Sequence, residues 1–299
     1  MGMHNFIKII NEDVETISEE LETNYYGENK FVEHLSKLKN KTQNHDSTLT
    51  YIINEDYYEE FLKSSFKILL INKETYEKIR TKPNITYILT ESPKESYAIL
   101  SNYIYKKNNY DLVDGGIDKS AVIDESSFID KNVQIGKNVR IGRNCSILKN
   151  TIIENNVVIG DNCVIGSTGL DSYINNDNDR ILIQTIGGVR IRENVTIKNF
   201  CNIDRGSGGR FTSIEKGALI GSHTHLAHDV IIGSSSMIID GSIIAGHVKI
   251  GKNVVLGLNT SVLQNIKIHD NAKTGIGTVV TLDLKEDQFM IGNPGRILK

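Results

Sequence analysis

The sequence lacks the features that mark several classes of protein. No window of about 18 uninterrupted apolar residues occurs, and the N-terminus has no apolar core of a secretion signal. The net charge is −3 and no basic cluster is present, so neither a nucleic-acid-binding surface nor a polybasic membrane patch is expected. We therefore expect a cytoplasmic protein that does not bind nucleic acid and does not insert into a membrane.

Cysteine is also scarce. The 299 residues include only three cysteines, Cys145, Cys163 and Cys201, and each occupies a small position of the six-residue repeat described next. Small buried side chains explain this placement better than a disulfide, a metal site or a nucleophile does.

A six-residue repeat organises the chain from about Ser120 to Thr274. An aliphatic residue returns at every sixth position, and a small or β-branched residue follows four places after each. The aliphatic positions are Ile123, Ile129, Ile135, Ile141, Ile147, Ile153, Ile159, Ile165, Ile191, Ile197, Ile203, Ile214, Ile220, Leu226, Ile232, Ile238, Ile244, Ile250, Leu256, Val262 and Ile268. This period fits neither a helix nor an ordinary strand, and it is typical of a parallel β-helix built of hexapeptide repeats. We predict a mostly β fold.

Residues 1–112 lack the repeat and predict a small N-terminal α/β domain. The expected helices are Val14–Leu21, Glu33–Leu38, Tyr57–Lys63 and Ser92–Tyr105, and the expected strands are Thr48–Ile53, Lys67–Ile71 and Thr86–Leu89. Asn and Gly pairs within residues 108–116 mark a hinge. We expect the β-helix to occupy residues 113–280 and an extended tail to occupy residues 281–299.

Two irregularities interrupt the repeat. The polar segment 167–186 must project from the stacked coils, and we favour a loop that contacts substrate over a mobile tip. The second irregularity, Asp204–Ser213, contains Gly206, Gly208 and Gly209.

Histidines gather in one part of the repeat. His223, His225 and His228 lie within six residues, and His247 follows about one coil later near the same edge. Imidazole titrates near neutral pH, so one chemistry makes His228 a general base that Asp229 orients, with a backbone N–H stabilising the oxyanion of a thioester. A second chemistry makes His223 and His228 zinc ligands.

The zinc alternative carries a resemblance to the γ-class carbonic anhydrases. That family binds zinc through a pair of histidines five residues apart and a third histidine far upstream. His223 and His228 have this separation, but no histidine occurs between His45 and His223. We therefore expect no metal site, and no metal or redox cofactor.

The first 280 residues resemble the UDP-3-O-acylglucosamine N-acyltransferase family (LpxD). The motif Tyr51-x-x-Asn54-x-x-Tyr57 corresponds to the family's uracil-binding motif, and an aromatic face beside an amide suits a pyrimidine. Residues 156–167, Gly187-Gly188-Val189 and Ile203-Asp204-Arg205-Gly206 also follow the family. The resemblance implies a left-handed β-helix, a homotrimer, and substrate contacts from the two polar residues of the last motif, Asp204 and Arg205.

The histidine motif is more similar to that of the related O-acyltransferases (LpxA). It is represented here by His225-Leu-Ala-His228-Asp229 and, one coil later, Ala245-Gly246-His247. The resemblance implies that His228 is the general base, that the Gly246 N–H is the oxyanion donor, and that His225 and His247 make auxiliary contacts. The N-acyltransferases place their Ala-Gly-His another coil on, where this chain has Asn265.

The acyl donor is the least defined substrate. Both families continue into a helical extension that contributes to recognising acyl carrier protein, whereas this sequence stops soon after Pro294. We therefore favour acyl-coenzyme A. The expected activity is N-acylation of a UDP- or dTDP-linked amino sugar, as in the enzymes that decorate surface polysaccharides. The alternatives are the same transfer from acyl carrier protein in lipid A synthesis, and a non-catalytic solenoid that binds nucleotide sugars.

Overall fold

The structure is a computed structural model that describes residues 12–35, 46–107, 111–175 and 177–298. The chain divides into two compact units. The first, which we call the α/β unit, comprises Met1–Leu112 with Leu170–Ile186, and the second, the coil unit, comprises Val113–Gly169 with Gly187–Lys299. Among the described residues, no helix has the length and apolar character needed to cross a membrane.

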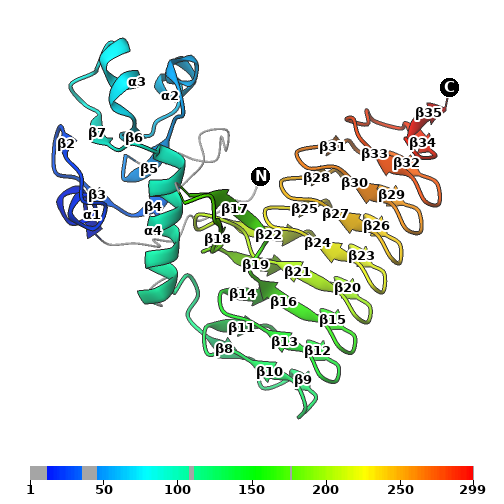
Figure 1. Ribbon diagram of the computed structural model, residues 1–299. Helices are drawn as coiled ribbons and strands as arrows, with labels where there is room; N and C mark the ends of the chain where they lie inside the picture. The colour runs from blue at the N-terminus through cyan, green and yellow to red at the C-terminus, as the bar shows by residue number, and fades with distance from the viewer. Residues whose placement is uncertain (1–11, 36–45, 108–110, 176, 299) are drawn as a thin grey trace. The chain divides into compact units, whose positions relative to one another are not determined.

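The α/β unit is built on a five-stranded sheet with the order β2-β7-β6-β5-β4 (Figure 1). Strands β4 to β7 are parallel and β2 is antiparallel to β7. The strands of the sheet are β2 (Tyr25–Tyr26), β4 (His34–Leu35), β5 (Thr48–Tyr51), β6 (Ile68–Ile71) and β7 (Thr86–Leu89). The remaining elements are the strand pair β1 (Glu12–Asp13) and β3 (Phe31–Val32), and the helices α1 (Val14–Glu20), η1 (Glu55–Tyr57), α2 (Tyr58–Leu62), α3 (Lys73–Lys78) and α4 (Pro93–Lys107).

Most of the elements expected in this unit are confirmed. The three predicted strands correspond to β5, β6 and β7, and three of the predicted helices correspond to α1, α2 and α4. The helix expected over Glu33–Leu38 is wrong for its first half, because residues 34–35 pair as a strand with β5; residues 36–38 lie outside the described residues. Helix α3 was not predicted, although Asn72 caps it by accepting a hydrogen bond from the Thr75 amide.

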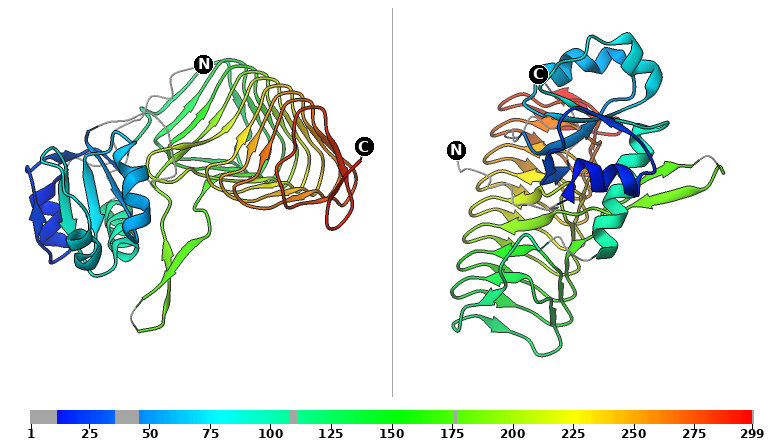
Figure 2. Two further views of the ribbon diagram at one scale, coloured as in Figure 1. Left: turned by 90° about the horizontal axis from the view of Figure 1, so that it is seen from above. Right: turned by 90° about the vertical axis from the view of Figure 1, so that its left-hand side faces the viewer.

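The coil unit is a parallel β-helix with three faces (Figures 1 and 2). Face 1 contains β8 (Gly116–Ile117), β11 (Val133–Ile135), β14 (Thr151–Ile153), β19 (Gly188–Ile191), β22 (Phe211–Ile214), β25 (Ile231–Ile232), β28 (Lys249–Ile250) and β31 (Lys267–Ile268). Face 2 contains β9 (Val122–Ile123), β12 (Arg140–Ile141), β15 (Val158–Ile159), β20 (Thr196–Ile197), β23 (Leu219–Ile220), β26 (Met237–Ile238), β29 (Val255–Leu256), β32 (Lys273–Thr274), β34 (Phe289–Ile291) and the antiparallel β35 (Arg296–Leu298). Face 3 contains β10 (Phe128–Ile129), β13 (Ser146–Ile147), β16 (Val164–Ser167), β21 (Asn202–Asp204), β24 (His225–Leu226), β27 (Ile243–Ile244), β30 (Ser261–Val262) and β33 (Val279–Val280).

The repeated aliphatic side chains form the core of the coil unit. Each pairs in register with its counterpart one coil away, as Ile214 does with Ile232 and Ile232 with Ile250. The small positions complete the same core, and Cys145, Cys163 and Cys201 are all buried in it with free thiols. The prediction that the cysteines are core residues is confirmed.

Most corners of the coils turn through one residue in the left-handed backbone region. We name the corners by the faces they join: the first corner joins faces 1 and 2, the second joins faces 2 and 3, and the third joins faces 3 and 1. Left-handed residues at the first corner are Asn138, Asn156, Asn194, Gly217, Ser235, Asn253, Asn271 and Asp287; at the second, Asn144, Asn162, Phe200, His223, Gly241, Asn259 and Gly277; at the third, Asn150, Asp229, His247 and Asn265. Asn and Gly dominate because they adopt this conformation most easily.

Both irregularities of the repeat lie at the third corner. The first is not a structureless loop, because it contains an antiparallel hairpin of β17 (Asp171–Ile174) and β18 (Arg180–Ile183). Asn102 of α4 binds this hairpin, donating to the Leu182 carbonyl at 3.0 Å and accepting from the Gln184 amide at 2.8 Å. The second irregularity is a short glycine-rich turn between β21 and β22. Neither changes the register of face 1, since β14 pairs with β19 and β19 with β22.

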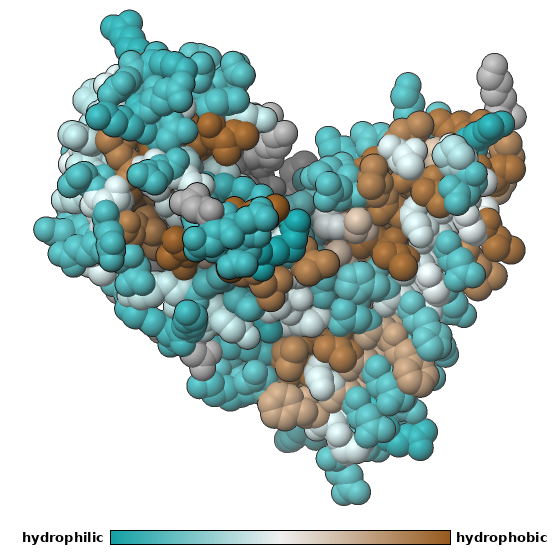
Figure 3. Space-filling view, in the orientation of Figure 1, coloured by the Kyte–Doolittle hydropathy of each residue, from teal (hydrophilic) through white to brown (hydrophobic). Residues whose placement is uncertain are grey.

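The outside of the coil unit is not uniformly polar. Patches of apolar residues are visible over the lower and upper coils in Figure 3. The large apolar side chains exposed on the unit include Val122, Phe128, Val158, Phe200, Leu219, Met237, Ile243 and Leu263.

Candidate active site

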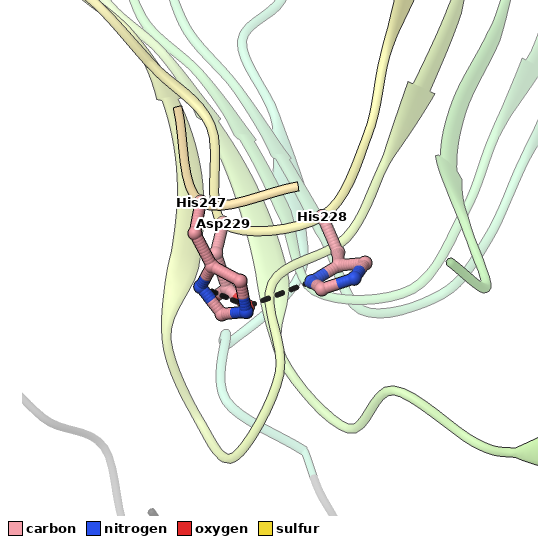
Figure 4. A group of neighbouring side chains, drawn as sticks. All are labelled: His228, Asp229 and His247. Atoms are coloured by element: carbon pink, nitrogen blue, oxygen red, sulfur yellow. Dashed lines mark hydrogen bonds and ion pairs between the residues drawn. The ribbon is translucent and has the colours of Figure 1, made fainter. Parts of the chain in front are cut away.

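Three predicted catalytic side chains meet at the third corner (Figure 4). His228 and Asp229 follow β24, and His247 follows β27 one coil later, where its amide donates to the His228 carbonyl at 3.0 Å. The Asp229 Oδ2 atom lies 3.0 Å from His228 Nδ1 and 3.6 Å from His247 Nδ1. The two imidazole rings are nearly perpendicular, with centroids 4.9 Å apart. The structure thus brings both histidines to one carboxylate.

The Asp229 carboxylate is buried, and protein groups hydrogen-bond to both of its oxygens. Its Oδ1 atom accepts from the Ser207 amide at 3.1 Å, and its Oδ2 atom accepts from the Ser207 hydroxyl at 2.7 Å. Arg210 places a guanidinium nitrogen 3.0 Å from Oδ2. Burial alone would raise the pKa of Asp229, but the charge of Arg210 and the hydrogen bond from His228 outweigh it and hold this pKa far below its usual range. Asp229 is therefore ionised at neutral pH.

An ionised Asp229 determines which nitrogen of His228 carries the proton. The carboxylate can only accept, so Nδ1 of His228 is the N–H donor, and Nε2 holds the free lone pair. Within the described residues, Nε2 has no hydrogen-bond partner. This is the tautomer that a histidine needs in order to take a proton from a substrate.

Two glycines enclose the His228 ring. A Cβ atom at Gly246 would lie 2.9 Å from both Cε1 and Nε2 of His228, and one at Gly169 would lie 2.8 Å from Cδ2. Such contacts are too close for a side chain, so the ring is held between two stretches of bare backbone. Gly246 in particular lies beside the basic nitrogen.

The amide of Gly246 lies one place before a left-handed residue of the third corner. At some other corners the amide in this position donates to a side chain of the next coil, as Lys252 does to Asp270 Oδ1 at 2.8 Å. Gly246 has no such acceptor among the described residues. A free N–H next to the basic nitrogen is the arrangement an oxyanion donor requires.

A second polar cluster lies on face 3, and it contains His225 and Asp204. Asn202 Nδ2 donates to Asp204 Oδ1 at 3.1 Å and to His225 Nδ1 at 2.9 Å, so His225 Nδ1 is an acceptor. Its Nε2 then carries the proton and lies 3.5 Å from Asp204 Oδ2. Because protein groups face both ring nitrogens, His225 is poorly suited to be the base, in contrast to His228.

Asp204 and Arg205 are both buried at the end of β21. Burial raises the pKa of Asp204, although hydrogen bonds from Ser167 and Asn202 and the charge of His225 oppose the shift. The Arg205 Nε donates to the Gly166 carbonyl at 2.7 Å. Arg205 thus ties β21 to the residues that lead into the hairpin insertion.

The structure separates the two histidines of the zinc alternative. His223 lies at the second corner, where its ring stacks on Phe200 with centroids 4.9 Å apart, whereas His228 lies at the third corner at the other end of β24. Among the described residues, the group that could offer three ligand atoms to a metal is His228, Asp229 and His247. Its carboxylate already accepts from Ser207 and faces the Arg210 cation, which disfavours a metal ion there.

The predicted base-binding residues lie in the α/β unit. Tyr51 ends β5, Asn54 immediately precedes η1, and Tyr57 is the last residue of η1. Burial and the charge of Asp171 raise the pKa of Tyr51 to about 12, and its ring packs against Tyr97 with centroids 5.2 Å apart. The Asn54 Oδ1 atom is buried and, among the described residues, has no hydrogen-bond partner.

The sequence did not predict the residues that contact His228, Asp229 and His225. Ser207 and Arg210 come from the second irregularity, Asn202 from β21, and Gly169 from the start of the insertion. For Ser207, Arg210 and Gly169 the only sequence signal was their position within the two breaks of the repeat at one corner. Which side chains return to the corner depends on the path of those breaks, and the repeat does not determine that path.

Comparisons with known proteins agree with this fold. The family described as bacterial transferase hexapeptide (six repeats) matches residues 138–168, and the hexapeptide repeat of succinyl-transferase matches residues 247–281. No curated protein sequence matches the chain.

Solved structures give further matches. A UDP-N-acetylglucosamine acyltransferase from Campylobacter jejuni has 25% identity and a TM-score of 0.50, covering 62% of this chain and 74% of that chain. LpxA from Moraxella catarrhalis has 28% identity and a TM-score of 0.41, covering 61% and 71%. A perosamine N-acetyltransferase from Caulobacter crescentus has 15% identity and a TM-score of 0.22, covering 87% and 82%. The last two scores are too low to inform function.

The repeat families and the first structural match support the predicted fold and enzyme class. The coil unit is a left-handed β-helix that contains hexapeptide repeats, and the protein is an acyltransferase.

Proposed function

We propose that the enzyme transfers an acyl group from an acyl thioester, with acyl-coenzyme A as donor, to the amine of a UDP- or dTDP-linked amino sugar. His228 is the general base of this reaction. The observation that carries the proposal is the free Nε2 of His228 beside the free amide of Gly246, with Asp229 holding the opposite ring nitrogen. The Campylobacter jejuni match, which is a UDP-N-acetylglucosamine acyltransferase, supports a nucleotide-linked sugar as the acceptor.

The reaction follows from the geometry of the third corner. The neutral amine attacks the thioester carbonyl carbon while His228 Nε2 removes a proton from the nitrogen. The Gly246 N–H donates to the developing oxyanion, and Asp229 stabilises the imidazolium. The tetrahedral intermediate then collapses, the carbon–sulfur bond breaks, and the imidazolium returns the proton to the thiolate. No metal or redox step is needed for this sequence.

The α/β unit contributes recognition of the nucleotide in this proposal. A buried amide oxygen without a partner costs free energy unless a ligand supplies a donor, and the imide N–H of uracil or thymine is such a donor. Asn54 Oδ1 is such an atom, and the rings of Tyr51 and Tyr57 lie on the same segment. In the coil unit, His225, Asp204 and Arg205 are proposed to contact the sugar, and His247 to assist at the reacting centre.

The proposal includes a homotrimer as the working assembly. The exposed apolar side chains on the outside of the coil unit support self-association, because single copies rarely leave large apolar patches in water (Figure 3). Light scattering of the purified protein measures the mass directly against the 33.4 kDa of one chain.

The test is release of free thiol from acetyl-, hydroxybutyryl- and longer acyl-coenzyme A in the presence of UDP- and dTDP-amino sugars. We expect release that depends on the acceptor and falls at least about a hundredfold in His228→Ala. His223→Ala is the matched control, since His223 lies at the other end of β24, at a different corner, and the activity of this variant should equal that of the wild type. Release that is unaffected by His228→Ala would refute the role of His228.

The donor and the non-catalytic alternative are distinguished in the same assay. Turnover only with acyl carrier protein would replace acyl-coenzyme A as donor and favour lipid A synthesis. Absence of turnover with either donor, together with binding of a nucleotide sugar by calorimetry, would favour the non-catalytic solenoid.

A further inference from the structure

Arg210 makes a set of contacts that link it to the proposed base through Asp229. Its Nη2 atom lies 3.0 Å from Asp229 Oδ2, its Nε donates to the Ser207 carbonyl at 3.1 Å, and its Nη2 also donates to the Ser207 hydroxyl. The Arg210 side chain is only 12% exposed. Gly208 and Gly209 both adopt positive φ, which turns the chain sharply enough to bring Arg210 back to the corner. The guanidinium is thus fixed against the carboxylate.

Charge balance explains why a cation is needed at this position. The Asp229 side chain is 4% exposed, so little of its charge is screened by water. A buried carboxylate without a counter-charge draws a proton onto its neighbours, and both of its neighbouring imidazoles can accept one. An imidazolium at His228 cannot take a proton from an amine. Arg210 is always charged and satisfies Asp229 without using either histidine.

We propose that Arg210 is a positioning residue for catalysis, whose guanidinium balances Asp229 so that Asp229 orients His228 without keeping a proton on it. The proposal rests on the proposed function, in which His228 is the base. The ionisable groups facing this site are Asp229 on the same turn, His247 from the next coil, Arg210 from the preceding turn and Asp204 from the end of β21. Of these, Arg210 alone carries a permanent positive charge.

The first test is the pH dependence of kcat/KM, which reports the free enzyme's base. Arg210→Met should move the acidic limb upward by about one pH unit, so that activity falls by up to about tenfold on the acidic side of the limb and returns to within about threefold of wild type on its alkaline side. Arg210→Lys keeps the positive charge and should return the acidic limb most of the way to its wild-type position. A loss that is equal at every pH would overturn the proposal, because it would indicate structural damage alone.

Two control variants separate charge from packing. Ser207→Ala removes one uncharged hydrogen bond to Asp229, that from the Ser207 hydroxyl, and should lower the rate without moving the limb. Arg143→Met removes an exposed surface arginine paired with Asp161 and should change nothing. If Arg210→Met does not fold by circular dichroism, Arg210→Gln, which keeps hydrogen-bond donors, is measured in its place. If Ser207→Ala moves the acidic limb as far as Arg210→Met does, the shift cannot be assigned to the charge of Arg210, and the proposal is overturned.

The second test does not depend on activity. Labelled histidine observed by NMR, with His228 assigned by comparison with His228→Gln, gives the titration midpoint of the ring and its neutral tautomer. We expect proton on Nδ1 in the wild type, and a higher midpoint in Arg210→Met. An unchanged midpoint would refute the role of Arg210 even if the enzyme transfers acyl groups. A raised midpoint in a protein without acyl transfer would refute the proposed function and leave the charge role supported.

Discussion

The first and third corners of the β-helix use the same turn for different purposes. At the first corner, left-handed asparagines bind one another in a ladder: Asn138 donates to Asn156, and Asn156 to Asn194, each at 3.2 Å. At the third corner the same backbone position holds Asp229 and His247, and both interruptions of the repeat occur there. One corner stabilises the stack, and the other gathers reactive side chains.

The comparison shows where a repeat fold can change without losing its core. The left-handed position favours short polar side chains, because they can hydrogen-bond their own turn. Replacing Asn by Asp or His there leaves the inward aliphatic ladder intact. The amide one place earlier is paired at Lys252 but free at Gly246. A corner thus acquires chemistry by changing its turn residue.

Asp229→Asn should have the largest effect on activity, because it restores the ordinary corner residue at the centre of the site. The turn remains favourable, but an amide can donate to His228 Nδ1 and so favours the wrong tautomer. We expect kcat/KM to fall about a thousandfold, measured by thiol release and corrected for folded protein by circular dichroism. The double variant with Arg210→Met is the control for the unpaired guanidinium. Activity within tenfold of wild type would contradict the role of Asp229.

Gly246→Ala should have the next largest effect. The added methyl would lie 2.9 Å from Nε2 of His228 and would displace the ring from the free amide. We expect a loss of about a hundredfold in kcat/KM, in the range of a lost oxyanion donor. Gly116→Ala is the matched control, since a Cβ atom there meets nothing within 4 Å and should leave the rate unchanged. Equal rates for the two variants would exclude close contact between Gly246 and the base.

His247→Asn should have a smaller effect on activity. Asn is the usual residue at this turn position, so the stack should keep its melting temperature. His247 lies 3.6 Å from Asp229, farther than His228 does, and we expect an auxiliary role with a loss of about tenfold in kcat/KM. A loss as large as that of His228→Ala would instead make His247 an equal partner in proton transfer.

The fold of the coil unit was predictable because one rule repeats many times. Each hexad places an aliphatic residue inward, and a register error would expose it, so Ile135 through Ile268 could be assigned before the structure was known. The α/β unit has no such redundancy. Its short strands β3 and β4 have too few residues to show a period, and the helix expected over Glu33–Leu38 was wrong at residues 34–35, which form β4.

The site was predictable where it follows the repeat and not where it departs from it. His228 and His247 fall on adjacent coils by counting residues, and their meeting at Asp229 follows. Arg210, Ser207 and Asn202 could not be placed by counting, because a glycine-rich turn intervenes or because the partner depends on side-chain rotamers. The hairpin of β17 and β18 was likewise mistaken for a loop. The segment is rich in Asn and Asp, which suggested a loop and masked a two-stranded pairing.

The smallest expected effect concerns the first corner, where the same turn should matter for stability alone. Asn194 has φ of 59° and accepts from Asn156, so Asn194→Ala loses a hydrogen bond and places a Cβ-bearing residue that cannot bind its own turn in the left-handed region. Asn194→Gly loses the same hydrogen bond but adopts this conformation freely, apart from the entropy that glycine loses on folding. We expect Asn194→Ala to lower the free energy of unfolding by about 1–2 kcal/mol and Asn194→Gly by about 1 kcal/mol or less, measured by urea unfolding. Both variants should keep wild-type kcat/KM. If a variant of Asn194 keeps the wild-type free energy of unfolding but loses activity, the first corner also takes part in the chemistry. The distinction between a stabilising corner and a reactive corner would then be wrong.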